Sequence, residues 1–152
     1  NYAAQNGAQV ISLSLGSKGA NSVFQRAIAN AVGSGAVVLM AAGNDNAQIS
    51  AQNLYSPVGY GASINGAIAI GSTAQSNQRS SFSNYSSTYV ELGAPGTDIY
   101  STLMNNSYGN MSGTSMATPI AAGAAGLVVG LLKARYVAVT PALVESLMQE
   151  SA

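Results

Sequence analysis

The stretch Ala36-Val-Val-Leu-Met-Ala-Ala42 decides the fold class, because it is a continuous apolar run that ends at Gly43-Asn44. A short apolar run bounded by turn residues is typical of a strand that is buried on both faces of a parallel sheet. Upstream, Val10-Ile-Ser-Leu-Ser-Leu15 alternates apolar and small polar residues and stops at Gly16. This alternation predicts a second strand.

The residues between these two strands predict a helix. Apolar side chains recur from Val23 to Val32 at helical spacing, with a cap at Asn21 or Ser22 and a stop at Gly33. A strand, a helix and a strand in this order form a β-α-β unit, so the two strands should lie parallel in a sheet covered by helices. The sequence therefore predicts an α/β fold.

The rest of the chain continues this pattern and shows no internal repeat or domain boundary. Two polar segments, 45–65 and 77–88, are expected to be surface loops. Regular elements are predicted as a buried strand at 67–70, a strand and turn around 91–96, a long helix from about Thr114 to Lys133, and a last helix that opens with Thr140 as cap and Pro141 as first residue.

Composition excludes several classes of function. Charged residues are 7% of the 152 residues and the formal net charge is zero, so nucleic-acid binding has no electrostatic basis. The hydrophobic fraction of 47% excludes a disordered chain. Without cysteine or histidine, neither a disulfide scaffold nor a transition-metal centre is expected. The uncharged run from Ile120 to Leu132 covers about 13 residues, short of the roughly 20 that a bilayer-spanning helix needs, so no membrane is expected as a partner.

The stretch Gly113-Thr-Ser-Met-Ala-Thr-Pro119 places a hydroxyl on a turn that leads into the long helix. Ser115 is either a nucleophile or a helix cap, since serine is common at both positions. A serine nucleophile needs a base, and this chain has no histidine. Neither Asp nor His follows Ser115, so any partners in the order Asp, His, Ser would precede it. The sheet also looks incomplete on its N-terminal side, which fits a catalytic unit completed from elsewhere.

Several ordered motifs resemble those of the subtilases, the subtilisin-like serine proteases. They are the nucleophile stretch itself, Val10–Gly16, Ala41–Asn44, Ser76–Ser83, Leu92–Gly96, and the Ala- and Gly-rich helix after Ser115. The resemblance covers essentially the whole chain. It implies a three-layer fold around a parallel sheet, with residues 1–152 as the C-terminal part of a peptidase catalytic domain.

The resemblance also implies catalytic roles for two residues. Ser115 would be the acylated nucleophile, and Asn44 would donate its side-chain N–H to the tetrahedral oxyanion together with the backbone N–H of Ser115. Without the resemblance, the favoured interpretation of Asn44 is a residue of the tight turn that follows a strand.

A substrate site is implied beside these residues. Ser14-Leu15-Gly16 would pair with an extended peptide, and small residues would line the pocket for the side chain before the scissile bond. The implied set is Ser14, Leu15, Gly16, Ala41, Ala42, Gly43 and Thr114. These small walls predict a roomy, apolar pocket for large hydrophobic side chains, although tight packing alone would also select small residues here.

The chain departs from the family pattern in two ways. Ile120 stands where many subtilases carry a noncatalytic histidine. More importantly, the motifs that carry the catalytic Asp and His are absent. The favoured hypothesis is a secreted serine endopeptidase of peptides and proteins, completed by an N-terminal fragment that carries Asp and His. The alternative is an inactive subtilase-like module that binds peptides. No cofactor is expected for catalysis. Many subtilases hold structural calcium, but no acidic cluster in this chain predicts such a site.

Overall fold

The computed structural model describes all residues 1–152 and is built around one parallel sheet of four strands. Its order is β1-β3-β5-β6, and every neighbouring pair is parallel. The strands span Val10–Leu13 (β1), Val37–Ala41 (β3), Ala67–Thr73 (β5) and Leu92–Pro95 (β6). The predicted α/β fold class is therefore confirmed, and the β-α-β unit is present with Val10 opposite Val37.

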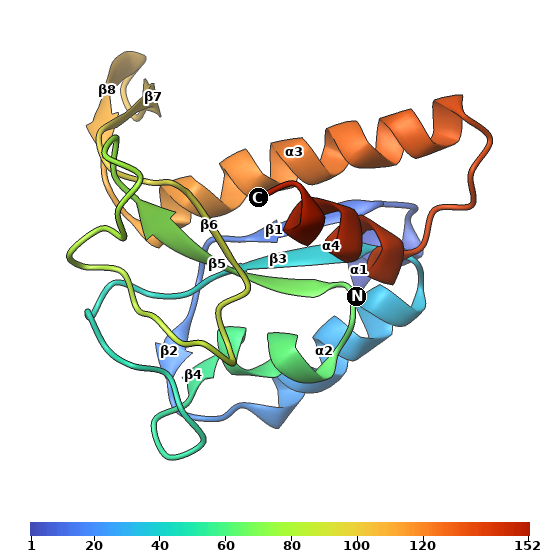
Figure 1. Ribbon diagram of the computed structural model, residues 1–152, viewed down its shortest axis with the longest axis horizontal. Coiled ribbons are helices and arrows are strands. Elements are labelled where there is room, and N and C mark those ends of the chain that lie inside the picture. Colours follow the sequence, from blue (N-terminus) through green and yellow to red (C-terminus); the bar gives the residue numbers. More distant parts are fainter.

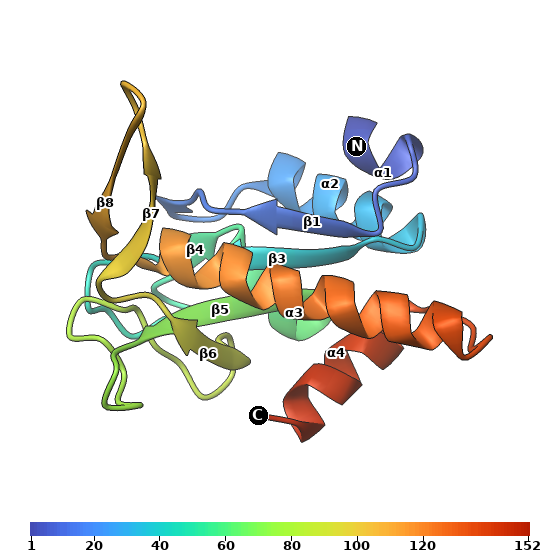
Figure 2. The same cartoon turned by 90° about the horizontal axis from the view of Figure 1, so that it is seen from above.

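Helices cover both faces of the sheet (Figures 1 and 2). They span Tyr2–Gln5 (α1), Ser22–Gly33 (α2), Thr114–Ala134 (α3) and Pro141–Glu150 (α4). In Figure 1, α3 runs above the sheet and α2 lies below it. The three layers match the arrangement that the sequence resemblance implies.

Side-chain caps fix the starts of two helices as the sequence predicts. The Asn21 side chain accepts hydrogen bonds from the N–H groups of Val23 and Phe24 at 3.0 and 3.2 Å. The Thr140 hydroxyl accepts from the N–H of Leu143 at 3.2 Å, with Pro141 as the first residue of α4. Each cap satisfies backbone donors that have no partner inside the helix.

The strands have apolar side chains on both faces, so the sheet carries a core on each side. β3 is buried along its whole length. One core joins Val37, Leu39, Ile68 and Ile70 to the inner faces of α3 and α4, and the other joins Val38, Met40 and Ala67 to α2. Burial on both faces explains why these strands read as continuous apolar runs.

The polar segments contain more structure than the sequence predicts. Residues 45–65 include the short strand β4 (Tyr55–Ser56), which pairs with β2 (Ser17–Lys18), and a 3₁₀ helix at Val58–Ser63. The expectation that 77–88 is a surface stretch is wrong in part, because Ser80, Ser83 and Asn84 are buried. Their side chains bond to the Ser72 hydroxyl and to backbone groups, which makes burial of polar side chains tolerable.

An antiparallel hairpin was not predicted at all. β7 (Ile99–Leu103) pairs with β8 (Ser107–Met111), and the hairpin projects from the body of the molecule near the start of α3 (Figures 1 and 2).

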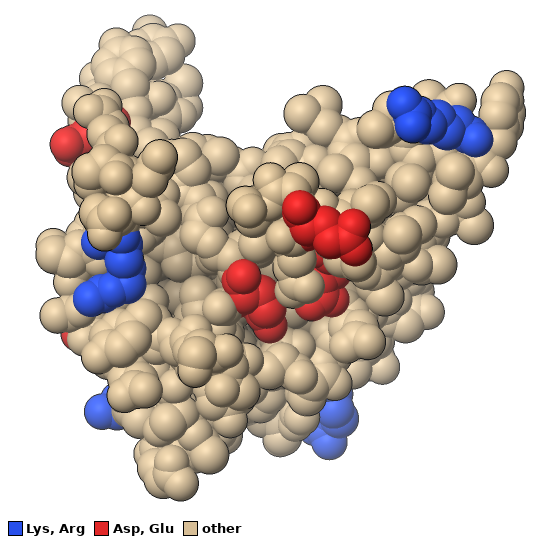
Figure 3. All heavy atoms as spheres, in the orientation of Figure 1, with Lys and Arg blue, Asp and Glu red and all other residues tan.

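Helix α3 is apolar on its exposed face as well as on its inner face. Leu127 is 79% exposed and Leu131 is 53% exposed. By length and composition α3 meets the criteria for a membrane-spanning helix, which the 13-residue run in the sequence did not suggest. The core helix of a soluble protein meets the same criteria, so this is weak evidence for a membrane. Charged groups are sparse on the face shown in Figure 3.

Candidate active site

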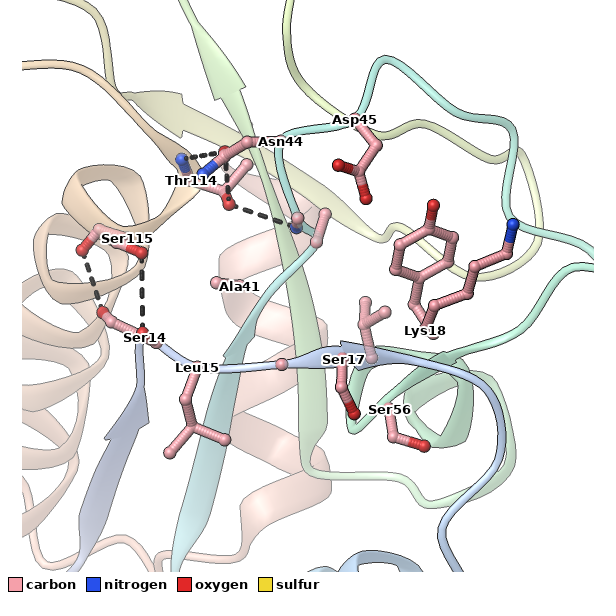
Figure 4. Close-up of a pocket in the computed structure, with 15 residues that line it drawn as sticks. Ser14, Leu15, Ser17, Lys18, Ala41, Asn44, Asp45, Ser56, Thr114 and Ser115 are labelled. Carbon is pink, nitrogen blue, oxygen red and sulfur yellow. Dashed lines mark hydrogen bonds between the residues drawn. The ribbon is translucent and has the colours of Figure 1, made fainter.

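Ser115 lies in the first turn of α3, close to the carboxyl end of β1. The Ser14 hydroxyl donates to the backbone carbonyl of Ser115 at 2.9 Å, which ties the turn to the residue after β1 (Figure 4). The Ser115 hydroxyl itself has only a long contact of 3.5 Å to the Ser14 carbonyl oxygen. No imidazole or carboxylate contacts Ser115 in this chain, so its hydroxyl has no base.

Asn44 is held in one orientation by Thr114. Its Oδ1 accepts from the backbone N–H and from the hydroxyl of Thr114, both at 2.9 Å. The Thr114 hydroxyl in turn accepts from the N–H of Gly43 at 3.1 Å. Because a backbone N–H can only donate, its partner must be the amide oxygen of Asn44. The Nδ2 group is therefore left free to donate elsewhere.

A second donor lies beside this amide. The backbone N–H of Ser115 forms no hydrogen bond within the chain, as expected for a group in the first turn of a helix. The Asn44 amide and the Ser115 N–H are thus two unused donors next to the same hydroxyl. This arrangement can stabilise negative charge on an oxygen.

A pocket of about 430 Å³ opens next to the two serines. It is lined by every residue that the sequence assigned to the site, namely Ser14, Leu15, Gly16, Ala41, Ala42, Gly43, Asn44, Thr114 and Ser115. The expectation of an apolar pocket is too simple, because Ser17, Lys18, Asp45 and Ser56 line it too. Figure 4 shows Asp45 and Lys18 on the side of the pocket away from Ser115.

Tyr55 also lines the pocket, and its surroundings shift the pKa of its hydroxyl. Burial raises the pKa of its hydroxyl, and the neighbouring Asp45 carboxylate raises that pKa further. Tyr55 therefore stays neutral at physiological pH and presents a donor rather than a charge.

A second hollow, of about 320 Å³, lies on another side of Ser115. Its walls are the β7–β8 hairpin and the first turns of α3, including Met116, Pro119 and Ile120. Sequence reasoning missed this hollow because it missed the hairpin. The chain contains no group of three or more acidic residues that could hold a metal ion.

The three-layer fold, with a serine hydroxyl at a helix start beside the Asn44 amide, is the arrangement of the subtilisin-like class of proteins. The subtilase family model matches residues 1–152, and the chain belongs to this family. Thermitase from Thermoactinomyces vulgaris is 50% identical over 126 residues, which are 83% of this chain and 42% of thermitase. Subtilisin DY from Bacillus licheniformis is 41% identical over 84% of this chain and 45% of its own length.

Solved structures agree with the sequence relatives. A cold-adapted subtilisin-like serine proteinase superimposes with a TM-score of 0.82 at 38% identity, over 98% of this chain and 50% of that protein. The self-cleaved protease domain of PatA gives a TM-score of 0.85 at 29% identity, over 99% of this chain and 56% of that domain. The chain thus spans about half the length of the relatives it matches.

Proposed function

We propose that this chain is the nucleophile-bearing part of a secreted serine endopeptidase. The observation that carries the proposal is the orientation of Asn44. Thr114 occupies its amide oxygen, so Nδ2 and the Ser115 N–H remain as paired donors beside a serine hydroxyl. A decayed site has no need to keep the nucleophile and the oxyanion donors together.

The chemistry follows from these positions. The Ser115 Oγ attacks the carbonyl carbon of the scissile bond, and a base takes its proton. The carbonyl oxygen becomes an oxyanion that accepts from Asn44 Nδ2 and the Ser115 N–H. The base then protonates the leaving amine as the C–N bond breaks, which leaves an acyl-enzyme on Ser115. Water hydrolyses this ester by the same steps. Without its base, Ser115 would retain only the modest acceleration that substrate binding and oxyanion stabilisation provide.

The substrate would lie along Ser14-Leu15-Gly16 with a side chain in the adjoining pocket. Backbone pairing at a strand edge gives affinity that depends little on sequence, while the pocket selects the side chain. A Cβ on Gly16 would lie 2.9 Å from the Ser56 carbonyl oxygen, so any other residue there would push β2 and β4 apart. The small walls at Ala41 and Ala42 leave room for a large side chain before the scissile bond, and Lys18 and Asp45 line the far side of this pocket.

The catalytic Asp and His would come from an N-terminal part of the same protease. Two features of the surface support this partner. β1 forms the edge of the sheet, and α3 exposes an apolar face at Leu127 and Leu131. An open strand edge and an exposed apolar patch together indicate a surface that is normally covered. No cofactor enters this scheme.

The experiment that tests this function is covalent labelling of the native protein. The protein is treated with a serine-directed phosphonate, and the intact masses are measured under denaturing conditions. We expect a second polypeptide segment that carries histidine and one adduct on Ser115, with no adduct on a Ser115→Ala variant. A histidine-free protein that binds peptides but takes up no phosphonate would contradict the proposal and support an inactive peptide-binding module.

A further inference from the structure

Asn84 is a buried polar side chain near the site that the catalytic scheme does not use. Its exposed fraction is 1% although it lies in a Ser- and Asn-rich segment. Burial of an amide costs free energy unless its polar atoms are bonded. The partners of Asn84 therefore show what this residue holds in place.

All of these partners belong to one loop. Asn84 Nδ2 donates to the Ala42 carbonyl at 2.9 Å. Asn84 Oδ1 accepts from the N–H groups of Asp45 and Ala47, both at 3.0 Å. The backbone N–H of Asn84 also donates to the Gly43 carbonyl at 2.9 Å. These bonds attach the backbone on both sides of Asn44 to a single residue.

The loop is shaped to admit this side chain. Gly43 has a φ of +98°, and a Cβ built on it would lie 2.5 Å from Asn84 Nδ2. Glycine is therefore required at this position for two reasons, the left-handed backbone and the close approach of the Asn84 amide. Arg79 holds the outer side of the same loop by donating to Asn46 Oδ1 at 3.0 Å.

We propose that Asn84 is a positioning residue for the oxyanion site. Thr114 sets the rotation of the Asn44 amide, whereas Asn84 sets the backbone from which that amide extends. This inference rests on the proposed function, because the oxyanion matters only if Ser115 is acylated. Transition-state stabilisation depends on donors that are already in place before reaction, so a loosened loop should slow the chemical step more than it weakens substrate binding.

The test uses the complete protease, including the N-terminal part that supplies Asp and His. For Asn84→Ala we expect kcat to fall by roughly 10- to 100-fold, the scale expected when a catalytic group is misplaced by about 1 Å. KM should change by less than about twofold, since uniform binding is left intact. Asn21→Ala is the matched control, because it also removes asparagine bonds to backbone N–H groups, but Asn21 caps α2 and does not line the pocket. Its kcat should stay unchanged.

A double-mutant cycle separates positioning from a general structural role. If Asn84 acts through Asn44, then Asn84→Ala should reduce kcat by no more than about twofold in an Asn44→Ala background, because residues that act as a unit are non-additive. If Asn84→Ala fails to fold, Asn84→Ser serves instead. It keeps a neutral hydroxyl in this buried position but loses the amide donor to Ala42.

The outcomes distinguish the two proposals. If the wild-type complex does not hydrolyse peptides, the proposed function fails. If it does, but Asn84→Ala keeps its kcat or adds its full loss to that of Asn44→Ala, then only the positioning role is overturned.

Discussion

Tyr136 occupies a backbone position that favours glycine. It follows α3 with a φ of 59°, and its N–H donates to the Lys133 carbonyl at 3.0 Å. The next N–H, that of Val137, donates to the Leu132 carbonyl at 2.9 Å. This pair of bonds is the Schellman motif that ends many helices, and the left-handed residue in it is usually glycine. Tyr136 is 97% exposed, so no packing compensates for the strained backbone.

We therefore expect Tyr136→Gly to stabilise the fold. Relief of the left-handed strain should raise the free energy of unfolding by about 1 kcal/mol. The measurement is equilibrium unfolding in urea. Tyr136→Ala is the matched control, because alanine removes the same ring but keeps a Cβ. An equal gain in both variants would mean that the ring, and not the backbone, is responsible.

Glu91 is a carboxyl group placed where ionisation is costly. Burial raises its pKa from 4.5 to about 7; the bond from the Ala69 N–H opposes this shift, and the nearby Glu145 carboxylate adds to it. Because the pKa is higher in the folded state, the protonated form is favoured by folding. The cost of ionisation is therefore absent below about pH 4.5 and grows as the pH rises to about 7.

Replacing Glu91 with glutamine should remove this pH dependence. Glutamine keeps an oxygen that can accept from Ala69. At pH 8 the free energy of unfolding of Glu91→Gln should exceed that of the wild type by up to about 3 kcal/mol, with little difference at pH 4. Unfolding curves at the two pH values test this, with Glu150→Gln as an exposed control. A difference that stays constant across pH would show that folding does not raise the pKa of Glu91.

At the residue scale, the sequence predicts the location of site residues that belong to recognisable motifs. Ser115 and Asn44 were assigned to one site because both lie in stretches that match family motifs, and the structure brings them to one pocket. Asn84 was not predicted, because its partners lie about 40 positions away in the chain. A single asparagine in a polar segment gives no sign that it is buried.

At the scale of elements, Gly66 lies immediately before β5 and packs against the first turn of α4. It has a φ of +101°, and a Cβ built on it would lie 2.2 Å from Pro141 Cβ. Its N–H donates to the Glu145 carboxylate at 2.5 Å. The end of the sheet and the first turn of α4 therefore meet at a residue with no side chain.

Gly66→Ala should separate these two elements. The strained backbone and the steric overlap together should lower the free energy of unfolding by about 3 kcal/mol. Thermal unfolding measures the loss. Gly7→Ala is a suitable control, because Gly7 has a similar φ of 84° but nothing within 4 Å of its Cβ position. If both variants lose the same amount, backbone strain alone accounts for it and the contact with Pro141 is unimportant.

The sequence did not predict the elements that lack a periodic pattern of apolar residues. The β7–β8 hairpin is largely exposed, so it shows no core-facing alternation. A turn signal was nevertheless present. Asn105 and Asn106 both adopt positive φ values, of 63° and 53°, and consecutive asparagines are favoured in hairpin turns of this kind.

At the scale of the whole molecule, the exposed face of α3 should govern how the isolated chain behaves. Leu127 and Leu131 are exposed on a helix whose surface is apolar all round. Large exposed apolar patches promote association. In sedimentation experiments we expect the isolated chain to self-associate, and Leu127→Glu to shift it towards monomer.

Val23→Glu is the control for that experiment, since Val23 is an exposed apolar residue on α2 and not on α3. It should leave the association unchanged. A wild-type chain that is already monomeric would contradict the idea that this face requires a cover.

The position of α3 after all four strands of the parallel sheet has a consequence for synthesis. Strands β1, β3, β5 and β6 all leave the ribosome before the helix that packs against each of them. Until residue 134 is made, Val37, Leu39, Ile68 and Ile70 have no helix on that face. A nascent sheet with one bare apolar face is prone to aggregate. The growing chain therefore exposes this apolar face throughout the interval between the synthesis of β3 and the synthesis of α3.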